Sequence, residues 1–306
     1  PRSAVDPCAE VIASGLLTTL QDGGRTGFRR YGVGGSGPLD TLAHAQANRA
    51  VGNPPAATTL ECTLVGPTLR FLRPTAFAVA GADLGARLER DDLGSWPVPR
   101  GIRVVARPGN VLSFEGRRSG CRAYIAFASG LDADLVMGSR ATDLMGGFGG
   151  LEGRALASGD VLALLSSVGG SESLRENEAP TTESDGDDDT SVRVVLGPQD
   201  GHFTTEAVEA FLSATWSVRG SSDRSGLRLE GPKLAHSGAS EIASDGMVPG
   251  CVQVPPDGQP IVMLADGPTT GGYPKIATVV RADLRKLGQL VPGVGRVTFH
   301  VIGTNP

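Results

Sequence analysis

The residues best suited to chemistry lie in a polar segment at residues 266–275, with the sequence DGPTTGGYPK. Lys275 offers a cation for a carboxylate or a carbonyl oxygen, and the hydroxyl and amide groups before it can hydrogen-bond a ligand. Donors placed around a carbonyl oxygen stabilise the negative charge that develops when an amide is attacked. The segment supplies five predicted substrate-binding residues: Thr269, Thr270, Gly271, Gly272 and Tyr273.

A second segment of this kind spans residues 246–260, GMVPGCVQVPPDGQP. The side-chain amide of Gln253 donates and accepts hydrogen bonds at once, which suits the recognition of another amide. Asp257 can orient a water molecule or a carboxylate, as can Ser36 in the N-terminal half. We therefore predict four catalytic residues for work on an amide carbonyl: Lys275, Gln253, Ser36 and Asp257.

Two further Gly-rich segments lie in the N-terminal half, at residues 18–40 and 139–150. Asp40 precedes a predicted helix, whose free amides and dipole favour an anionic group. The same residue also suits the N-cap of that helix. The remaining predicted binding residues are Thr142, Asp143 and Arg224, together with Asp40. Each segment also has the composition of a stabilised turn, so composition leaves both roles open.

Several well-known motifs are absent. Residues 267–275 lack the GxxxxGK[ST] spacing of a P-loop, because Lys275 follows a proline and precedes Ile276. The four histidines show no HxH, HxxxH or HExxH spacing and the four cysteines form no CxxC pair, so we predict no metal site and four reduced thiols. No GxSxG nucleophile elbow is present, although a dispersed Ser-His-Asp set stays open.

The negative charge of the chain is concentrated in one segment. Residues 169–191 hold eight acidic residues and one arginine, a net of −7, whereas the other 25 acidic and 27 basic residues give +2. Such a segment without aromatic residues is typical of a flexible linker. No basic patch of the kind found in nucleic-acid binders is apparent. No apolar run approaches the ~18 residues of a membrane span, and no signal peptide is evident, so we expect a cytoplasmic protein.

Short β-branched runs between Gly and Pro residues favour strands over helices. The expected strands are residues 76–80, 102–106, 111–114, 122–128, 161–165, 192–196, 227–229, 261–265 and 297–302. Periodic apolar residues predict three short helices, at residues 40–51, 205–214 and 282–290. The predicted fold class is mostly β with a few short helices, in two β-rich domains at residues 1–168 and 192–306 joined by the acidic segment 169–191.

The polar segments form an ordered series of motifs. The series begins with TTxQDxGR at residues 18–25, SGxxD at 36–40 and ANRxVGN at 47–53, with Glu61 following. It continues with SRxTDL at 139–144, SDR at 222–224, LEGP at 229–232, VPGxxQVPxDGQP at 248–260 and TTGGYPK at 269–275. This series resembles the family variously called allophanate hydrolase subunit 2, 5-oxoprolinase C subunit, biotin-dependent carboxyltransferase and Kip-type antagonist of a kinase inhibitor. Gly34 and Gly35 stand where relatives often have prolines.

The resemblance implies two cyclophilin-like β-barrel halves and a smaller first subunit, with the active cleft near the contact between the two subunits. Members fused to a biotin carboxylase act on urea, whereas stand-alone bacterial members help to open the lactam of 5-oxoproline at the expense of ATP, with a third, ATP-dependent subunit. The chain has no Met-Lys-Met sequence of a biotin carrier, so biotin would act only in trans. We expect no cofactor on this chain itself.

We therefore expect the second subunit of a heteromeric amide-processing enzyme, of the allophanate hydrolase or ATP-dependent 5-oxoprolinase type, in a heterodimer or heterotetramer. The alternative is a non-catalytic regulatory protein that binds and antagonises a Kip-type kinase inhibitor. A third reading is a β protein whose barrels bind a small acid.

Overall fold

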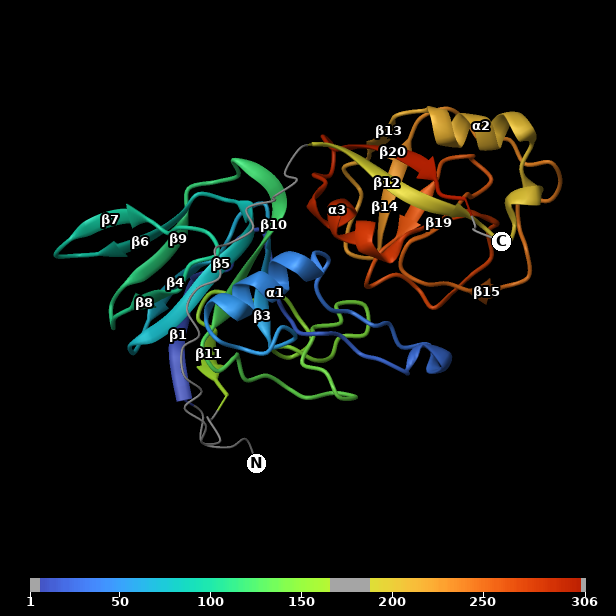
Figure 1. Cartoon of the computed structure of the whole chain (residues 1–306). Helices are drawn as coiled ribbons and strands as arrows, with labels where there is room; N and C mark the ends of the chain where they lie inside the picture. The colour runs from blue at the N-terminus through green and yellow to red at the C-terminus, as the bar shows by residue number, and fades with distance from the viewer. Residues whose placement is uncertain (1–5, 166–187, 304–306) are drawn as a thin grey trace. The chain divides into compact units, whose positions relative to one another are not determined.

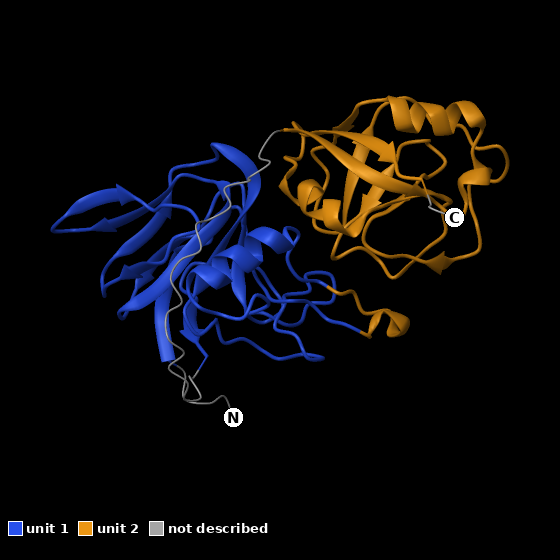
Figure 2. Cartoon of the chain, in the orientation of Figure 1, with its two compact units in different colours: residues 1–26, 36–184 blue, residues 27–35, 185–306 orange. Residues whose placement is uncertain are grey.

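A computed structural model describes residues 6–165 and 188–303 of the chain (Figure 1). The chain divides into two compact units (Figure 2). Unit 1 comprises residues 1–26 and 36–184, and unit 2 comprises residues 27–35 and 185–306. Most of the predicted acidic linker lies outside the described residues, but residues 189–191 at its end belong to a strand rather than to a linker.

Unit 1 contains two sheets of antiparallel strands. The first has the order β11-β1-β4-β9-β6-β7, formed by β1 (Asp6–Ala13), β4 (Thr68–Phe71), β6 (Ala86–Arg90), β7 (Gly94–Pro97), β9 (Val111–Phe114) and β11 (Val161–Leu164). The second has the order β2-β3-β10-β5-β8, formed by β2 (Leu17–Gln21), β3 (Thr59–Thr63), β5 (Thr75–Asp83), β8 (Val104–Ala106) and β10 (Ser119–Phe127). One apolar cluster takes Val11 and Leu112 from the first sheet and Leu60 and Ile125 from the second, so both sheets enclose one core.

Strand β10 is buried on both faces because a helix covers the second sheet on the side away from that core. Ala123, Ile125 and Phe127 join the core between the sheets, whereas Tyr124 and Ala126 pack toward helix α1 (Thr41–Ala50). Side chains of a strand alternate between its two faces, so this division follows directly from the sequence of β10. The helix thereby brings its first turn next to the polar groups of β3 and β10.

Unit 2 is built on a closed seven-strand barrel with the order β12-β19-β16-β17-β14-β13-β20 (Figure 1). Its strands are β12 (Asp189–Leu196), β13 (Trp216–Val218), β14 (Gly226–Glu230), β16 (Cys251–Gln253), β17 (Ile261–Met263), β19 (Lys275–Val279) and β20 (Arg296–Val301). The parallel pair β12–β20 closes the barrel, and the other ladders are antiparallel. A separate ribbon pairs β15 (Asp245–Gly246) with β18 (Thr270–Gly271).

Two short helices accompany the barrel, α2 (Thr205–Ser213) and α3 (Leu284–Gln289). Helix α2 packs on β20, with the rings of Phe211 and Phe299 stacked 4.5 Å apart. The 3-10 turns η1 (Arg29–Tyr31), η2 (Asp200–His202) and η3 (Arg281–Asp283) complete the regular structure of this unit. No helix in the described ranges is both long and apolar enough to cross a membrane.

The mostly β class is confirmed, and the predicted strands and helices coincide with observed ones to within a few residues. The third predicted helix begins as the 3-10 turn η3 and becomes α-helical only at Leu284. Among the described residues, a closed barrel is present in unit 2 alone. In unit 1 the strands form two facing sheets instead. The sequence pattern missed eleven strands within residues 6–165 and 188–303, namely β1, β2, β3, β4, β6, β7, β13, β15, β16, β18 and β19. Of these, β1 pairs with both β4 and β11.

Candidate functional site

Lys275 is a buried cation at the start of β19. Its side chain is 3% exposed, and its Nζ atom donates to Asp245 Oδ2 at 2.6 Å and to the carbonyl oxygen of Gly246 at 3.4 Å. Asp245 lies on β15 and its side chain is 52% exposed. The hydrogen bond from Lys275 is the main cause that lowers the pKa of the Asp245 carboxyl, so Asp245 is ionised at neutral pH.

Gln199 joins the two members of this ion pair. Its Nε2 group donates to Asp245 Oδ2 at 3.2 Å, and its Oε1 atom accepts from the backbone amide of Lys275 at 3.3 Å. The Asp245 carboxylate therefore receives hydrogen bonds from the ammonium of Lys275 and from the side-chain amide of Gln199. Neither Gln199 nor Asp245 was among the predicted site residues. Asp245 directly precedes the motif segment at 246–260, which is the one signal that could have marked it.

Gln253 lies beside Lys275, because the two residues are partners in the β16–β19 ladder. Its side chain is largely buried and its Oε1 atom has no hydrogen-bond partner. Gly271 of β18 approaches the same atom: a Cβ atom added there would lie 3.1 Å from Gln253 Oε1 and 3.1 Å from Met247 Sδ. The β15–β18 ribbon pairs Asp245 with Gly271, so it brings both residues to this end of the barrel.

Arg29 adds a second cation to the neighbourhood of the ribbon. It belongs to the 27–35 segment of unit 2, and its Nη2 group donates to the carbonyl oxygens of Met247 at 2.6 Å and Pro268 at 3.3 Å. Burial lowers the pKa of its guanidinium. Met247 in turn packs with Cys251 and Met263 in a small apolar cluster. Met247 therefore connects the Arg29 contact with this apolar cluster.

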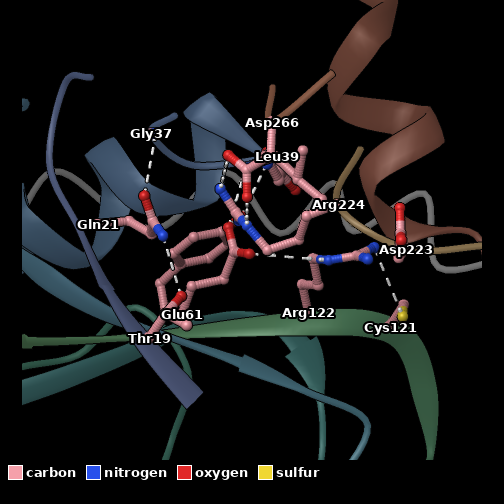
Figure 3. A network of polar contacts seen from close by, with 12 residues as sticks. Thr19, Gln21, Gly37, Leu39, Glu61, Cys121, Arg122, Asp223, Arg224 and Asp266 are labelled. Carbon is pink, nitrogen blue, oxygen red and sulfur yellow. Dashed lines mark hydrogen bonds and ion pairs between the residues drawn. The ribbon is translucent and has the colours of Figure 1, made fainter. Parts of the chain in front are cut away.

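The other predicted residues of unit 2 have mainly structural contacts. Arg224 donates to the Asp266 carboxylate at 2.7 and 3.1 Å, and both side chains are buried (Figure 3). Asp257 is exposed and accepts from the backbone amide of Gln259 at 3.0 Å, which stabilises a turn. The carbonyl oxygen of Thr269 accepts from the backbone amide of Met247, and that of Gly272 accepts from the backbone amide of Ile242. The side chain of Thr270 is exposed and that of Tyr273 is half-buried. Among the predicted residues, the structure therefore brings together Lys275, Gln253 and Gly271.

Unit 1 holds a second polar network, around the buried carboxylate of Glu61 on β3. Glu61 Oε2 accepts from the Leu39 backbone amide at 2.9 Å (Figure 3). The same oxygen accepts from the Tyr124 hydroxyl at 2.7 Å. Arg122 lies 3.8 Å from Glu61 Oε1, and both of these side chains are buried. Burial, followed by the negative charge of Glu61, raises the pKa of Tyr124. Glu61 was noticed only as part of a motif, and Tyr124 and Arg122 were not predicted as site residues.

Asp40 links this network to helix α1. Its backbone amide donates to the Tyr124 hydroxyl at 2.7 Å, and its Oδ1 atom accepts from the amides of Leu42 and Ala43 at 3.1 and 3.0 Å. Asp40 is therefore the N-cap of the helix, the structural role that the sequence left open. Ser36 precedes it with a φ of 50°, and its hydroxyl oxygen is buried without a hydrogen-bond partner.

Thr142 and Asp143 lie in the Gly-rich loop of unit 1. The Thr142 amide donates to the carbonyl oxygen of Leu20 at 2.8 Å, and its buried hydroxyl has no partner. Asp143 Oδ1 accepts from the Gly146 amide at 2.8 Å and closes a turn. Gln21 fixes the neighbouring loop, because its Oε1 atom accepts from Gly37 at 2.9 Å (Figure 3). These contacts order the motif segments of unit 1 around one another.

The four cysteines are free and buried, as predicted. Burial raises the pKa of Cys8 to about 12 and raises that of Cys62 as well, so neither thiol is a nucleophile at neutral pH. Within residues 6–165 and 188–303, no three His, Cys, Asp or Glu side chains come close enough to hold a metal ion. The candidate chemistry therefore centres on the Lys275 site and on the Glu61 network, each within its own unit.

Comparisons with known proteins identify the family. The chain is 39% identical to the C subunit of 5-oxoprolinase from Escherichia coli over 288 residues, which are 93% of this chain and 88% of that protein. It is 35% identical to the C subunit of 5-oxoprolinase from Haemophilus influenzae over 275 residues, covering 89% of this chain and 84% of that protein. The crystal structure of Kluyveromyces lactis urea carboxylase matches 98% of this chain with a TM-score of 0.90 and 32% identity, although the match covers only 28% of that larger chain.

The sequence model of a protein family, described as carboxyltransferase domain, subdomain A and B, matches residues 31–301, which is most of the chain. The match contains both the Glu61 network and the Lys275 site. The protein therefore belongs to the carboxyltransferase domain family of subdomains A and B.

Proposed function

We propose that this chain is the second subunit of a heteromeric enzyme that opens the lactam ring of 5-oxoproline with ATP. The observation that carries the proposal is the 39% identity with the C subunit of 5-oxoprolinase from Escherichia coli, against 32% with the Kluyveromyces lactis urea carboxylase. A subunit of the oxoprolinase type is therefore a nearer counterpart than the corresponding domain of a urea enzyme. The reaction adds water to the lactam carbonyl and breaks the C–N bond, and the ring nitrogen becomes the amino group of glutamate.

The Lys275 site supplies groups that such a substrate needs. Lys275 offers a buried ammonium, and Gln253 offers an amide oxygen that has no hydrogen-bond partner. Gly271 has no side chain that would crowd this oxygen. A buried ammonium interacts strongly with a carboxylate or carbonyl oxygen, because little water competes with it. We assign to Lys275, Gln253 and Gly271 the binding of the substrate.

The partners follow from the same proposal. A smaller first subunit supplies part of the active cleft, and a third subunit links ATP hydrolysis to ring opening. No group of this chain is assigned to ATP, since the sequence contains no P-loop and the proposal gives this chain the lactam alone. Biotin, if the complex used it, would come from another chain.

The experiment is a reconstitution. The chain is co-purified with the first and third subunits, and glutamate release from 5-oxoproline is measured with and without ATP. The proposal predicts glutamate formation only when all three subunits and ATP are present. Turnover of allophanate by this chain and the first subunit, with no turnover of 5-oxoproline, would show an allophanate hydrolase instead. A stable complex that turns over neither compound would favour a regulatory protein.

A further inference from the structure

We propose that the place occupied by the Asp245 carboxylate on Lys275 is the binding place of the substrate's own carboxylate, and that Gln253 Oε1 accepts the N–H group of the adjacent amide. The inference rests on the proposed function and narrows its substrate class to amides that carry both an N–H group and a neighbouring carboxylate. Asp245 is then an internal competitor, which leaves the ammonium when a ligand arrives.

The first step of the argument is the burial of the ammonium. Lys275 is 3% exposed and its Nζ atom sits beside one carboxylate, that of Asp245. Removing a charge from water is costly unless an opposite charge accompanies it. A negatively charged group is therefore required at this position, whether it comes from the protein or from a ligand.

The second step is the exposure of the anion that is present. Asp245 stands on β15, a strand of two exposed residues that, in the part of the chain that the structure describes, pairs only with the two residues of β18. Its side chain is 52% exposed, so water can solvate the carboxylate as it leaves. The Asp245 carboxylate is held here by three donors, Lys275 Nζ, Gln199 Nε2 and the backbone amide of Gly246, and a ligand carboxylate beside the ammonium would keep the two side-chain donors.

The third step is the unpartnered acceptor next to the cation. Gln253 Oε1 is buried and has no hydrogen-bond donor, and Gln253 pairs with Lys275 across the β16–β19 ladder. A buried acceptor without a donor costs free energy, which a ligand N–H group would recover. Gly271 lies against the same atom, and a side chain at that position would crowd the acceptor.

Together, the cation and the acceptor select a ligand with two features. The carboxylate must reach Lys275 while the amide N–H reaches Gln253, as the carboxylate and the ring N–H of 5-oxoproline can, because both are attached to one carbon atom. A neutral lactam lacks the first feature. A lactone acid, in which oxygen replaces the ring N–H group, lacks the second feature. Its ring oxygen, a hydrogen-bond acceptor, would face Gln253 Oε1, which is also an acceptor.

The test measures binding by calorimetry, without ATP, on the chain alone and on its complex with the first subunit. The probes are 5-oxoproline, 2-pyrrolidinone and 5-oxotetrahydrofuran-2-carboxylate. We expect 5-oxoproline to bind at least about tenfold more tightly than either analogue, a difference of about 1.4 kcal/mol in each case. Equal affinity for all three probes, or no binding of 5-oxoproline to either preparation, would overturn the inference.

Variants test the exchange itself. Asp245→Asn leaves the buried ammonium without its counter-ion, so the variant should bind 5-oxoproline about tenfold more tightly and 2-pyrrolidinone no more tightly. The matched control is Asp189→Asn, which removes an exposed carboxylate 3.9 Å from Arg296 elsewhere in unit 2 and should change neither affinity. Weaker binding of 5-oxoproline to Asp245→Asn, with an unchanged melting temperature, would show that Asp245 is a ligand contact rather than a competitor.

Turnover separates this inference from the proposed function. A complex that releases glutamate from 5-oxoproline but shows no preference among the probes refutes the carboxylate exchange alone. A chain that shows the expected preferences but supports no glutamate release in the full complex refutes the proposed function and leaves the binding site in place.

Discussion

The ammonium of Lys275 and the carboxylate of Asp245 lie 2.6 Å apart, yet the lysine side chain is 3% exposed and the aspartate side chain 52% exposed. The barrel therefore fixes the cation, whereas a two-residue strand at the surface supplies the counter-ion. An ion pair of this kind differs from a buried pair, in which neither partner can leave. It also differs from a pair at the surface, which holds neither partner in place.

Lys275→Met should abolish most of the activity of the assembled complex while the fold survives. Methionine keeps the length and apolar stem of lysine but removes the ammonium, and the exposed Asp245 left behind is solvated. Loss of a charge-assisted hydrogen bond of about 1.5–3 kcal/mol lowers kcat/KM by roughly 10- to 100-fold, mainly through a higher KM. Glutamate release and the melting temperature are the two measurements. Lys233→Met, at an exposed position, is the control, and unchanged turnover in Lys275→Met would exclude a role for this residue.

Asp283→Asn should destabilise unit 2 at neutral pH. The backbone amide and the guanidinium of Arg193 donate to the Asp283 carboxylate at 2.8 and 2.9 Å, and the side-chain hydrogen bond lowers its pKa to about 2. The stabilisation is present above the ordinary carboxyl pKa of ~4 and is lost as the pH falls toward 2. Because Arg193 is half-exposed, we expect a loss of about 1–2 kcal/mol at pH 7.

Urea denaturation at pH 7 and at pH 2.5 checks this expectation. The difference in the free energy of unfolding between wild type and Asp283→Asn should be large at pH 7 and small at pH 2.5. The control is Asp189→Asn, whose carboxylate is exposed and 3.9 Å from Arg296, and which should change the free energy by less than ~0.5 kcal/mol. A difference that is the same at both pH values would contradict the linkage.

His44 should make unit 1 sensitive to mild acid. The ring is buried on α1 with its Nδ1 atom 3.0 Å from Thr59 Oγ1, and burial lowers its pKa to about 4. The unfolded chain binds a proton at His44 below a pH of ~6.5, whereas the folded chain does so only near 4. The free energy of unfolding should therefore fall as the pH falls from 6.5 to 4, by about 3 kcal/mol from this residue.

Denaturation curves of His44→Gln between pH 7 and pH 4 provide the measurement. Glutamine can still hydrogen-bond Thr59 but does not titrate, so its stability should change less over this range than that of the wild type. His300→Gln, on an exposed part of β20, should leave the pH dependence unchanged. A wild-type profile that is flat between pH 6.5 and pH 4 would show that His44 is not kept neutral by the fold.

Tyr124→Phe should loosen the start of helix α1. The Tyr124 hydroxyl accepts from the Asp40 amide and donates to Glu61, so its removal takes a partner from each of two buried groups. A buried polar group that loses a partner costs about 1–3 kcal/mol. Urea denaturation should show this loss, and hydrogen exchange of the Leu42 and Ala43 amides should become faster. Tyr31→Phe, at an exposed tyrosine, should be neutral, and equal stability of both variants would contradict the role of the network.

The sequence alone predicted the three helices and nine of the twenty strands that the structure describes, and it marked which segments are polar and Gly-rich. The strand predicted at residues 111–114 coincides with β9, and the helix predicted at 40–51 contains α1, because alternation, periodicity and capping are local properties. The ordered motifs likewise located Lys275, Gln253 and Gly271, which the fold brings together at one end of the barrel. These parts of the site follow from neighbouring residues in the chain.

Only the tertiary structure decided which polar residues meet. Asp245 and Gln199 reach Lys275 from 30 and 76 positions away, and Glu61 meets Tyr124 from 63 positions away. These contacts depend on which strands pair, on the closure of the barrel in unit 2 and on the packing of the two sheets in unit 1. No local sequence pattern encodes them. A sequence shows which groups a chain possesses, whereas the burial of Lys275 and the exposure of its partner arise from where the barrel ends and the ribbon begins.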